Sequence, residues 1–194
     1  MSRAELLRRG GALLAFSAFA APAIAVPAGA AVVPDGDIAY LRLLIAVELL
    51  KTDFQARALA SGRLSRPTAR TMRRMHADDN AHYAGLVALM NQAAQQPATA
   101  ADIDFSYPAG SLASQHAIAN RSLRLATLAL GAYLGAVQNV QTPEQRLPLG
   151  QIAANEAQHV SVLAQLVGKP AIGRPFAAAL PIDAVSAALD TYES

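Results

Sequence analysis

Two acid-x-x-histidine pairs are the residues of this chain best suited to chemistry: Asp79 with His82, and Glu156 with His159. In each pair a carboxylate and an imidazole lie three residues apart, which places them on one face of a helix. Each pair also lies within an apolar stripe whose steps of three and four residues are typical of a helix packed against other helices. The stripes read Met72, Met75, Asp79, His82, Leu86, Leu89 and Leu149, Ile152, Glu156, His159, Leu163, Leu166. A buried acid and a buried histidine are costly without a partner, and a metal ion is one such partner.

The composition fits a single helical domain. The chain has 194 residues, of which 53% are hydrophobic and 15% charged, enough to build one substantial core. Alanine- and leucine-rich periodic stretches favour helix over strand. The absence of cysteine excludes disulfides, thiolate metal ligands and cysteine nucleophiles.

Residues 1–25 resemble an export signal. The pair Arg8 and Arg9 precedes an uncharged run over residues 10–33, as in twin-arginine signals, and small-residue cleavage motifs end at Ala25 and Ala30. We expect removal of the signal, although an uncleaved membrane anchor is the alternative reading. A disordered tail over 26–36 and a domain over 37–194 would follow. The mature protein would be periplasmic or extracellular, with no stable membrane insertion.

Removal of the signal makes the chain formally neutral. It takes away three arginines and one glutamate, which leaves thirteen basic and thirteen acidic side chains. The charge balance therefore gives no reason to expect nucleic acid as a partner. We interpret the one local basic cluster as a solvated helix face; it consists of Arg63, Arg66, Arg70, Arg73 and Arg74.

Capping residues and helix breakers predict a bundle. The expected helices span residues 37–60, 66–91, 111–140, 143–167 and 182–192, with Asp37, Ser65 and Thr142 as N-caps. Short loops within each pair of long helices imply antiparallel neighbours, and the connection of roughly 20 residues between helices two and three suits a crossover. The predicted fold class is an all-α, ferritin-like four-helix bundle with a short C-terminal helix.

A ferritin-like carboxylate centre takes one Glu from each of two helices and a Glu-x-x-His from each of the other two. Glu48 is the candidate from the first helix. The third helix offers only Leu125, Ala126 and Thr127 at the corresponding place, and no acid occurs between Phe105 and Pro143. The site would therefore have three carboxylates and two imidazoles. We predict that such a site holds at most one tightly bound iron, manganese or zinc ion, or no metal at all.

Other polar and small residues leave alternatives open. Lys51 follows Glu48 by three residues, so its ammonium could reach the buried cluster, but a solvent-exposed Lys51 is the interpretation we favour. His76 and His116 are expected at the surface or at helix ends. The Gly131-x-x-x-Gly135 spacing indicates a close contact, either inside the bundle or between the subunits of a homodimer.

Short motifs along the chain resemble the ferritin-like domain family of exported bacterial proteins, which includes the desiccation-related proteins. They occupy residues 37–54, 79–82, 102–105, 132–136 and 155–159. The resemblance implies that the metal-ligand positions are those of Glu48, Asp79, His82, Glu156 and His159. Lys51 stands where the family usually has a second Glu, and the acid of the third helix is missing near Ala126.

Two functional hypotheses follow. The first is an exported protein with a reduced or vestigial metal centre and a mainly structural, binding or stress-related role. The second is a mono- or dinuclear iron or manganese oxidoreductase that acts on ferrous iron or peroxide. Catalytic residues remain unassigned under both. Oligomeric iron storage is disfavoured because the mature chain is neutral and its third helix has no acids.

Overall fold

The computed structural model describes residues 33–193, and five helices lie within that range. They are α2 (Asp35–Ala60), α3 (Arg66–Gln92), α4 (Gln115–Asn139), α5 (Pro143–Leu166) and α6 (Ile182–Asp190). The expected signal, its cleavage sites and most of the expected tail lie outside the described residues.

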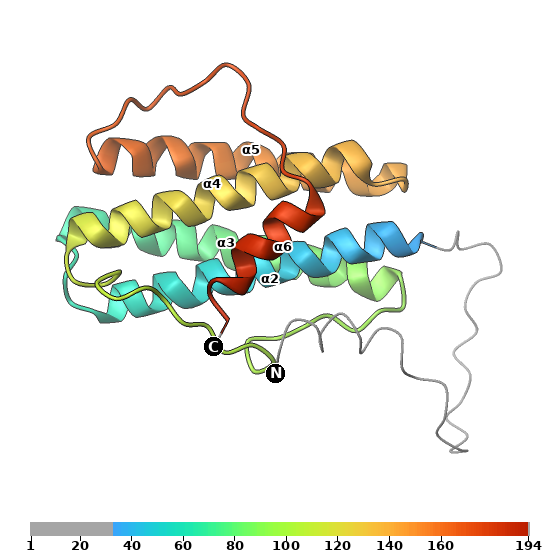
Figure 1. The fold of residues 1–194 in the computed structure, drawn as a ribbon, viewed down its shortest axis with the longest axis horizontal. Coiled ribbons are helices and arrows are strands. Elements are labelled where there is room, and N and C mark those ends of the chain that lie inside the picture. The colour runs from blue at the N-terminus through green and yellow to red at the C-terminus, as the bar shows by residue number, and fades with distance from the viewer. Residues whose placement is uncertain (1–32, 194) are drawn as a thin grey trace.

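Four long helices form the bundle and confirm the predicted all-α fold class. The antiparallel pair α2 and α3 packs against the antiparallel pair α4 and α5 (Figure 1). The connection between α3 and α4 runs along the bundle from one end to the other, as the crossover prediction requires (Figure 1). No helix in the described part of the chain combines the length and the hydropathy needed to span a membrane.

The apolar core lies between the two helix pairs. Its fully buried members include Leu44, Leu50, Phe54, Leu86 and Leu149. Each such side chain contributes roughly 1.5–3 kcal/mol by leaving water. Ionisable side chains interrupt this core at the middle of the bundle, although their burial costs more free energy than the burial of apolar residues. The core is therefore not purely apolar at the middle of the bundle.

Two helix starts differ from the sequence prediction. Helix α2 begins at Asp35 rather than after Asp37, and the buried Asp37 carboxylate accepts backbone N–H groups of Gln141 at 2.9 Å and Thr142 at 2.8 Å. Asp37 therefore stabilises the turn before α5, where the Thr142 side chain makes no capping bond. Helix α4 begins at Gln115, because Ser114 caps it by accepting from the Ala117 N–H at 3.1 Å.

The C-terminal helix α6 covers α2 and α4 (Figure 1). It ends at Asp190, two residues before the predicted end. The chain beyond it joins the crossover, since the Ser106 N–H donates to the Tyr192 carbonyl at 2.7 Å. The crossover is in turn held on α2 by Tyr107, whose hydroxyl donates to Asp53 at 2.7 Å. These contacts close one side of the bundle.

The two glycines of α4 meet the segment before α6, not another helix. The Leu180 N–H donates to the Gly131 carbonyl at 2.9 Å. A Cβ at Gly135 would overlap the Leu180 carbonyl oxygen. The close contact that the spacing predicted is therefore made inside the chain, by the segment that leads into α6.

Gly135→Ala is expected to destabilise the protein by about 1–3 kcal/mol, because the Leu180 backbone must move away. Gly85→Ala is the matched control, since Gly85 lies in α3 with open space at its Cβ. That change should stabilise by roughly 0.5–1 kcal/mol through helix propensity. Urea denaturation measures both. Equal effects of the two substitutions would contradict the close packing at Gly135.

Candidate metal centre

Helix α2 brings three polar side chains to the bundle interior. Glu48, Lys51 and Gln55 follow the three- and four-residue steps of one helical face, and they are 0%, 2% and 6% exposed. Their neighbours on this face are apolar residues of the core. The local sequence forms a helix because leucine, alanine and isoleucine dominate it and neither proline nor glycine interrupts it between Gly36 and Gly62.

Helices α3 and α5 supply the two acid-x-x-histidine pairs. Ser65 caps α3 by accepting from the Thr68 N–H, and Pro67 lies in the first turn as predicted. Asp79 and Glu156 are completely buried. The His82 and His159 side chains are 10% and 6% exposed. Both pairs therefore point into the bundle, on the faces that their stripes predicted.

The five predicted residues converge. Glu48, Asp79, His82 and Glu156 each offer a ligand atom, and these atoms lie within 4.8 Å of one another. His82 Nδ1 lies 3.2 Å from Glu156 Oε1. His159 joins the group through Nδ1, which lies 3.4 Å from Asp79 Oδ1. The two imidazole rings are 6.2 Å apart between centroids, so both histidines belong to one cluster.

Lys51 lies at the centre of this cluster, so the favoured expectation of a solvent-exposed Lys51 is wrong. Its Nζ donates to three carboxylates at once, over distances of 3.2, 2.9 and 2.5 Å to Glu48, Asp79 and Glu156. The four-carbon stem of a lysine is long enough to reach inward or outward. The inward direction is favoured because this face of α2 is buried and three acidic side chains meet there.

Three residues around the cluster were missed by sequence reasoning. The Tyr133 hydroxyl of α4 donates to Glu48 at 2.6 Å, and the Gln55 amide donates to Asp79 at 2.6 Å. Asp78 Oδ2 lies 3.5 Å from His159 Nε2. A signal for Gln55 was present, because it continues the spacing of Glu48 and Lys51. Tyr133 likewise stands seven residues after Ala126, on the buried face of α4.

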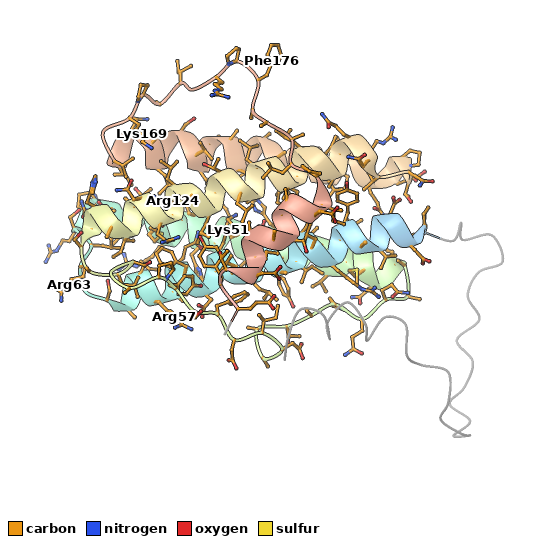
Figure 2. All side chains as sticks on the ribbon, in the orientation of Figure 1. Lys51, Arg57, Arg63, Arg124, Lys169 and Phe176 are labelled. Atoms are coloured by element: carbon orange, nitrogen blue, oxygen red, sulfur yellow. The ribbon has the colours of Figure 1, made fainter. Side chains whose placement is uncertain are left out.

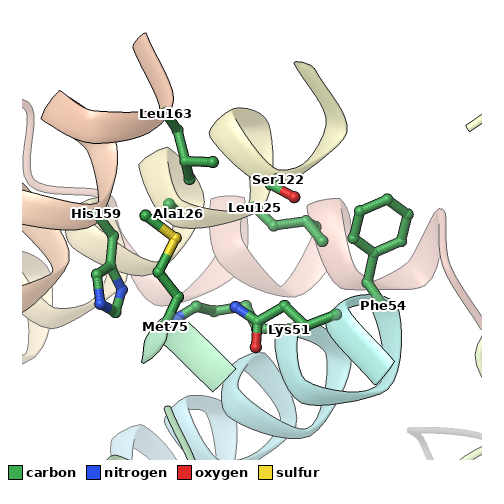
Figure 3. A pocket seen from close by; sticks show the side chains of 9 residues that line it. Lys51, Phe54, Met75, Ser122, Leu125, Ala126, His159 and Leu163 are labelled. Carbon is green, nitrogen blue, oxygen red and sulfur yellow. The ribbon is translucent and has the colours of Figure 1, made fainter. Parts of the chain in front are cut away.

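The α4 side of the cluster carries no acid, as the sequence indicated. Ser122, Leu125 and Ala126 instead line a small cavity next to Lys51 and His159 (Figure 3). Its volume of about 10 Å³ is roughly that needed for one water molecule. Leu125 and Ala126 both face the interior, whereas Thr127 is exposed. A side chain that replaced Ala126 would therefore extend toward the cluster.

The charges of the cluster depend strongly on one another. Burial alone would lower the pKa of Lys51, but Glu48, Glu156 and Asp79 raise it above its ordinary value, so the ammonium stays charged. Burial alone would likewise raise the pKa of Glu156, but Lys51 holds it well below its usual range. Three carboxylates thus face one fixed cation and two imidazoles.

Asp79 and the histidines shift toward their protonated forms. Burial raises the pKa of Asp79 to about 7, although Lys51 opposes this change. Burial would lower the pKa of His82, but contacts with Glu156 and Glu48 raise it to about 9. Burial also opposes the raised pKa of His159, which results mainly from Glu156. The folded cluster therefore binds more protons near neutral pH than the same residues bind in the unfolded chain.

The stability of the metal-free protein is expected to fall as pH rises from about 6 to about 9, with a melting temperature several degrees lower at the upper value. Both the raised pKa of His82 and the raised pKa of Asp79 act in this direction, because the folded state holds protons that the unfolded chain releases earlier. Glu156 acts in the opposite direction in acid. Its lowered pKa stabilises the folded protein, and this contribution is lost as the pH falls below the ordinary Glu pKa of 4.5. Calorimetry across pH measures the profile. His82→Gln should flatten its alkaline part, and a flat wild-type profile would contradict the assigned charges.

The arrangement has the donor types for one ion but not for two. Glu156 Oε2 is buried without a hydrogen-bond partner among the described residues, so it is free to act as a ligand. Carboxylate oxygens and imidazole nitrogens suit iron, manganese or zinc. However, three of the four candidate ligands already bind the Lys51 ammonium. A second ion would also need a carboxylate from α4, and α4 contains no Asp or Glu.

Comparison with known proteins agrees with the ferritin-like fold. A family model described as a ferritin-like domain matches residues 36–169. The matched range contains α3, α4, α5, all but the first residue of α2, and the five predicted ligand residues. A search of curated proteins gave no match.

Proposed function

Because the chain belongs to the ferritin-like domain family, we propose that it is an exported member with a reduced metal centre, in which the Lys51 ammonium takes the place of a metal ion. Its role would be mainly structural, binding or stress-related. The observation that carries this proposal is the set of three contacts between Lys51 Nζ and the carboxylates of Glu48, Asp79 and Glu156. The ammonium of this lysine neutralises part of the negative charge of the carboxylates, which a metal ion would neutralise in a metal centre of this fold.

The residues do not fit a dinuclear centre. Such a site takes four carboxylates and two imidazoles, and this cluster has three carboxylates. Asp79 also has a shorter side chain than the Glu of the Glu-x-x-His pairs in such centres, so Asp79 is less suited to bridging two ions. On the α4 side, Leu125 and Ala126 provide no ligand atom.

A single-ion oxidoreductase is the second candidate. It is supported by the four ligand atoms within 4.8 Å and by the free Oε2 of Glu156. An iron or manganese ion at this place would supply redox chemistry toward ferrous iron or peroxide. Binding would require the Lys51 ammonium to leave the carboxylates, so we expect weaker binding than at a complete four-carboxylate site.

Elemental analysis of protein purified from its native compartment tests the proposal. We expect less than one first-row metal ion per chain, the same content in Glu156→Ala, and a melting temperature that a chelator leaves unchanged. One ion per chain that is lost in Glu156→Ala would favour the oxidoreductase. Two ions per chain bound at micromolar free metal would show that the missing α4 ligand has been misjudged.

Export is supported by Arg8 and Arg9, the uncharged run after them and the two cleavage motifs. We propose that the mature chain begins near Val26 or Ala31. N-terminal sequencing of the secreted or periplasmic protein identifies its first residue directly. An intact Met1 or Ser2 on membrane-bound protein would instead favour an anchor.

A further inference from the structure

The segment between α5 and α6 carries apolar side chains away from the bundle. It forms an arch over α5, with Phe176 near its outermost point (Figure 2). Ile172 and Phe176 are 90% and 87% exposed, the highest values among the large hydrophobic side chains of the described residues. Single exposed apolar side chains are common, so what matters is whether these two adjoin a larger apolar surface.

A pocket lies beneath the first half of this segment, between it and helices α4 and α5. Its volume is about 710 Å³, which is within the range of small-molecule sites. Leu123 of α4 and Val160 and Ala164 of α5 line it from the bundle side, and Ile172 lines it from the segment. The apolar part could therefore enclose a hydrocarbon chain between bundle and segment.

Three cations line the same pocket: Arg124, Lys169 and Arg174. No Asp or Glu lines it, and none of the three cations forms an ion pair within residues 33–193. The end of α5 does not need the Lys169 side chain, because backbone N–H groups of Gly168 and Lys169 satisfy the carbonyls of Gln165 and Ala164. The sequence also has no acid between Glu156 and Asp183. The pocket thus combines an apolar lining with an unbalanced positive charge.

We propose that this pocket binds an amphiphilic anion with a single acyl chain, such as a free fatty acid. The carboxylate would bind among Arg124, Lys169 and Arg174, because guanidinium groups pair well with carboxylates. The acyl chain would lie along Leu123 and Val160 and would cover the exposed face of Ile172. The site is separate from the Lys51 cluster, so it does not depend on whether that cluster holds metal.

Isothermal titration calorimetry with decanoate tests this proposal on the mature protein. We expect one site per chain, weaker binding of the uncharged decanol, and no measurable binding of acetate. Arg124→Gln/Arg174→Gln should weaken decanoate binding at least tenfold, and Ile172→Ser should weaken it several-fold. The matched control is Arg63→Gln/Arg73→Gln, which removes two exposed arginines outside the pocket and should leave the affinity unchanged.

The test has a stability control and a second arm, which distinguishes a free fatty acid from a membrane lipid as the source of the acyl chain. Because all substituted side chains are exposed, melting temperatures should remain at the wild-type value. Absence of decanoate binding, or equal binding by wild type and by Arg124→Gln/Arg174→Gln, would overturn the proposal. Sedimentation with phosphatidylglycerol vesicles is the second arm. Vesicle binding without decanoate binding would also overturn it, in favour of a membrane surface.

Discussion

Lys51→Met is expected to lower the free energy of unfolding by about 3–5 kcal/mol, because it leaves three buried carboxylates without their shared cation. Methionine keeps much of the length and the apolar stem of lysine, so the loss should come from charge rather than from volume. The defect should be smaller near pH 5, where the carboxylates can take up protons in place of the missing ammonium. Chemical denaturation at the two pH values measures this.

The chain offers a matched control, since Lys169 is its only other lysine. Lys169 is exposed, and Lys169→Met should change stability by less than about 0.5 kcal/mol. Added manganese or zinc should raise the melting temperature of Lys51→Met but not that of the wild type, because only the variant has a free carboxylate cluster. A Lys51→Met protein as stable as the wild type at neutral pH would refute the central role of this lysine.

The double substitution Lys51→Glu/Ala126→Glu should convert the cluster into a metal-dependent centre. It removes the competing ammonium and adds a carboxylate at a buried position of α4 that lines the cavity beside Lys51. We expect the metal content to rise to about two ions per chain, the number that the complete ferritin-like ligand set holds. Elemental analysis after loading with iron or manganese measures this content.

The metal-free double variant should be less stable than the wild type by several kcal/mol, since it buries unpaired negative charge. Its melting temperature should then rise with metal concentration. The control is Lys51→Gln/Ala126→Gln, because its two glutamines have nearly the same size and shape as the two glutamates but add no negative charge. Leu125→Glu is the alternative for the second position, since Leu125 also lines the cavity. Metal content no higher in the Glu variants than in the Gln control would rule out this repair.

The sequence determined the helical architecture and most of the candidate site by itself. Helical periodicity and capping depend on residues within a few positions of one another, so Ser65 and Pro67 marked the start of α3 correctly. The stripes placed Asp79 and Glu156 on buried faces for the same local reason. The lack of an acid on α4 was equally visible, because it needed only the order of the helices and the spacing from Glu48.

The partner that each polar group takes depends on how the helices pack. Lys51 has a flexible stem, and its inward position follows from acids on α2, α3 and α5 that meet only in the folded bundle. Asp37 could have capped its own helix, but the α4–α5 turn brings the N–H groups of Gln141 and Thr142 to it. Gly135 meets the segment before α6 for the same reason. Short-range patterns fix which face of a helix is buried, whereas contacts between side chains far apart in the chain depend on how the helices pack.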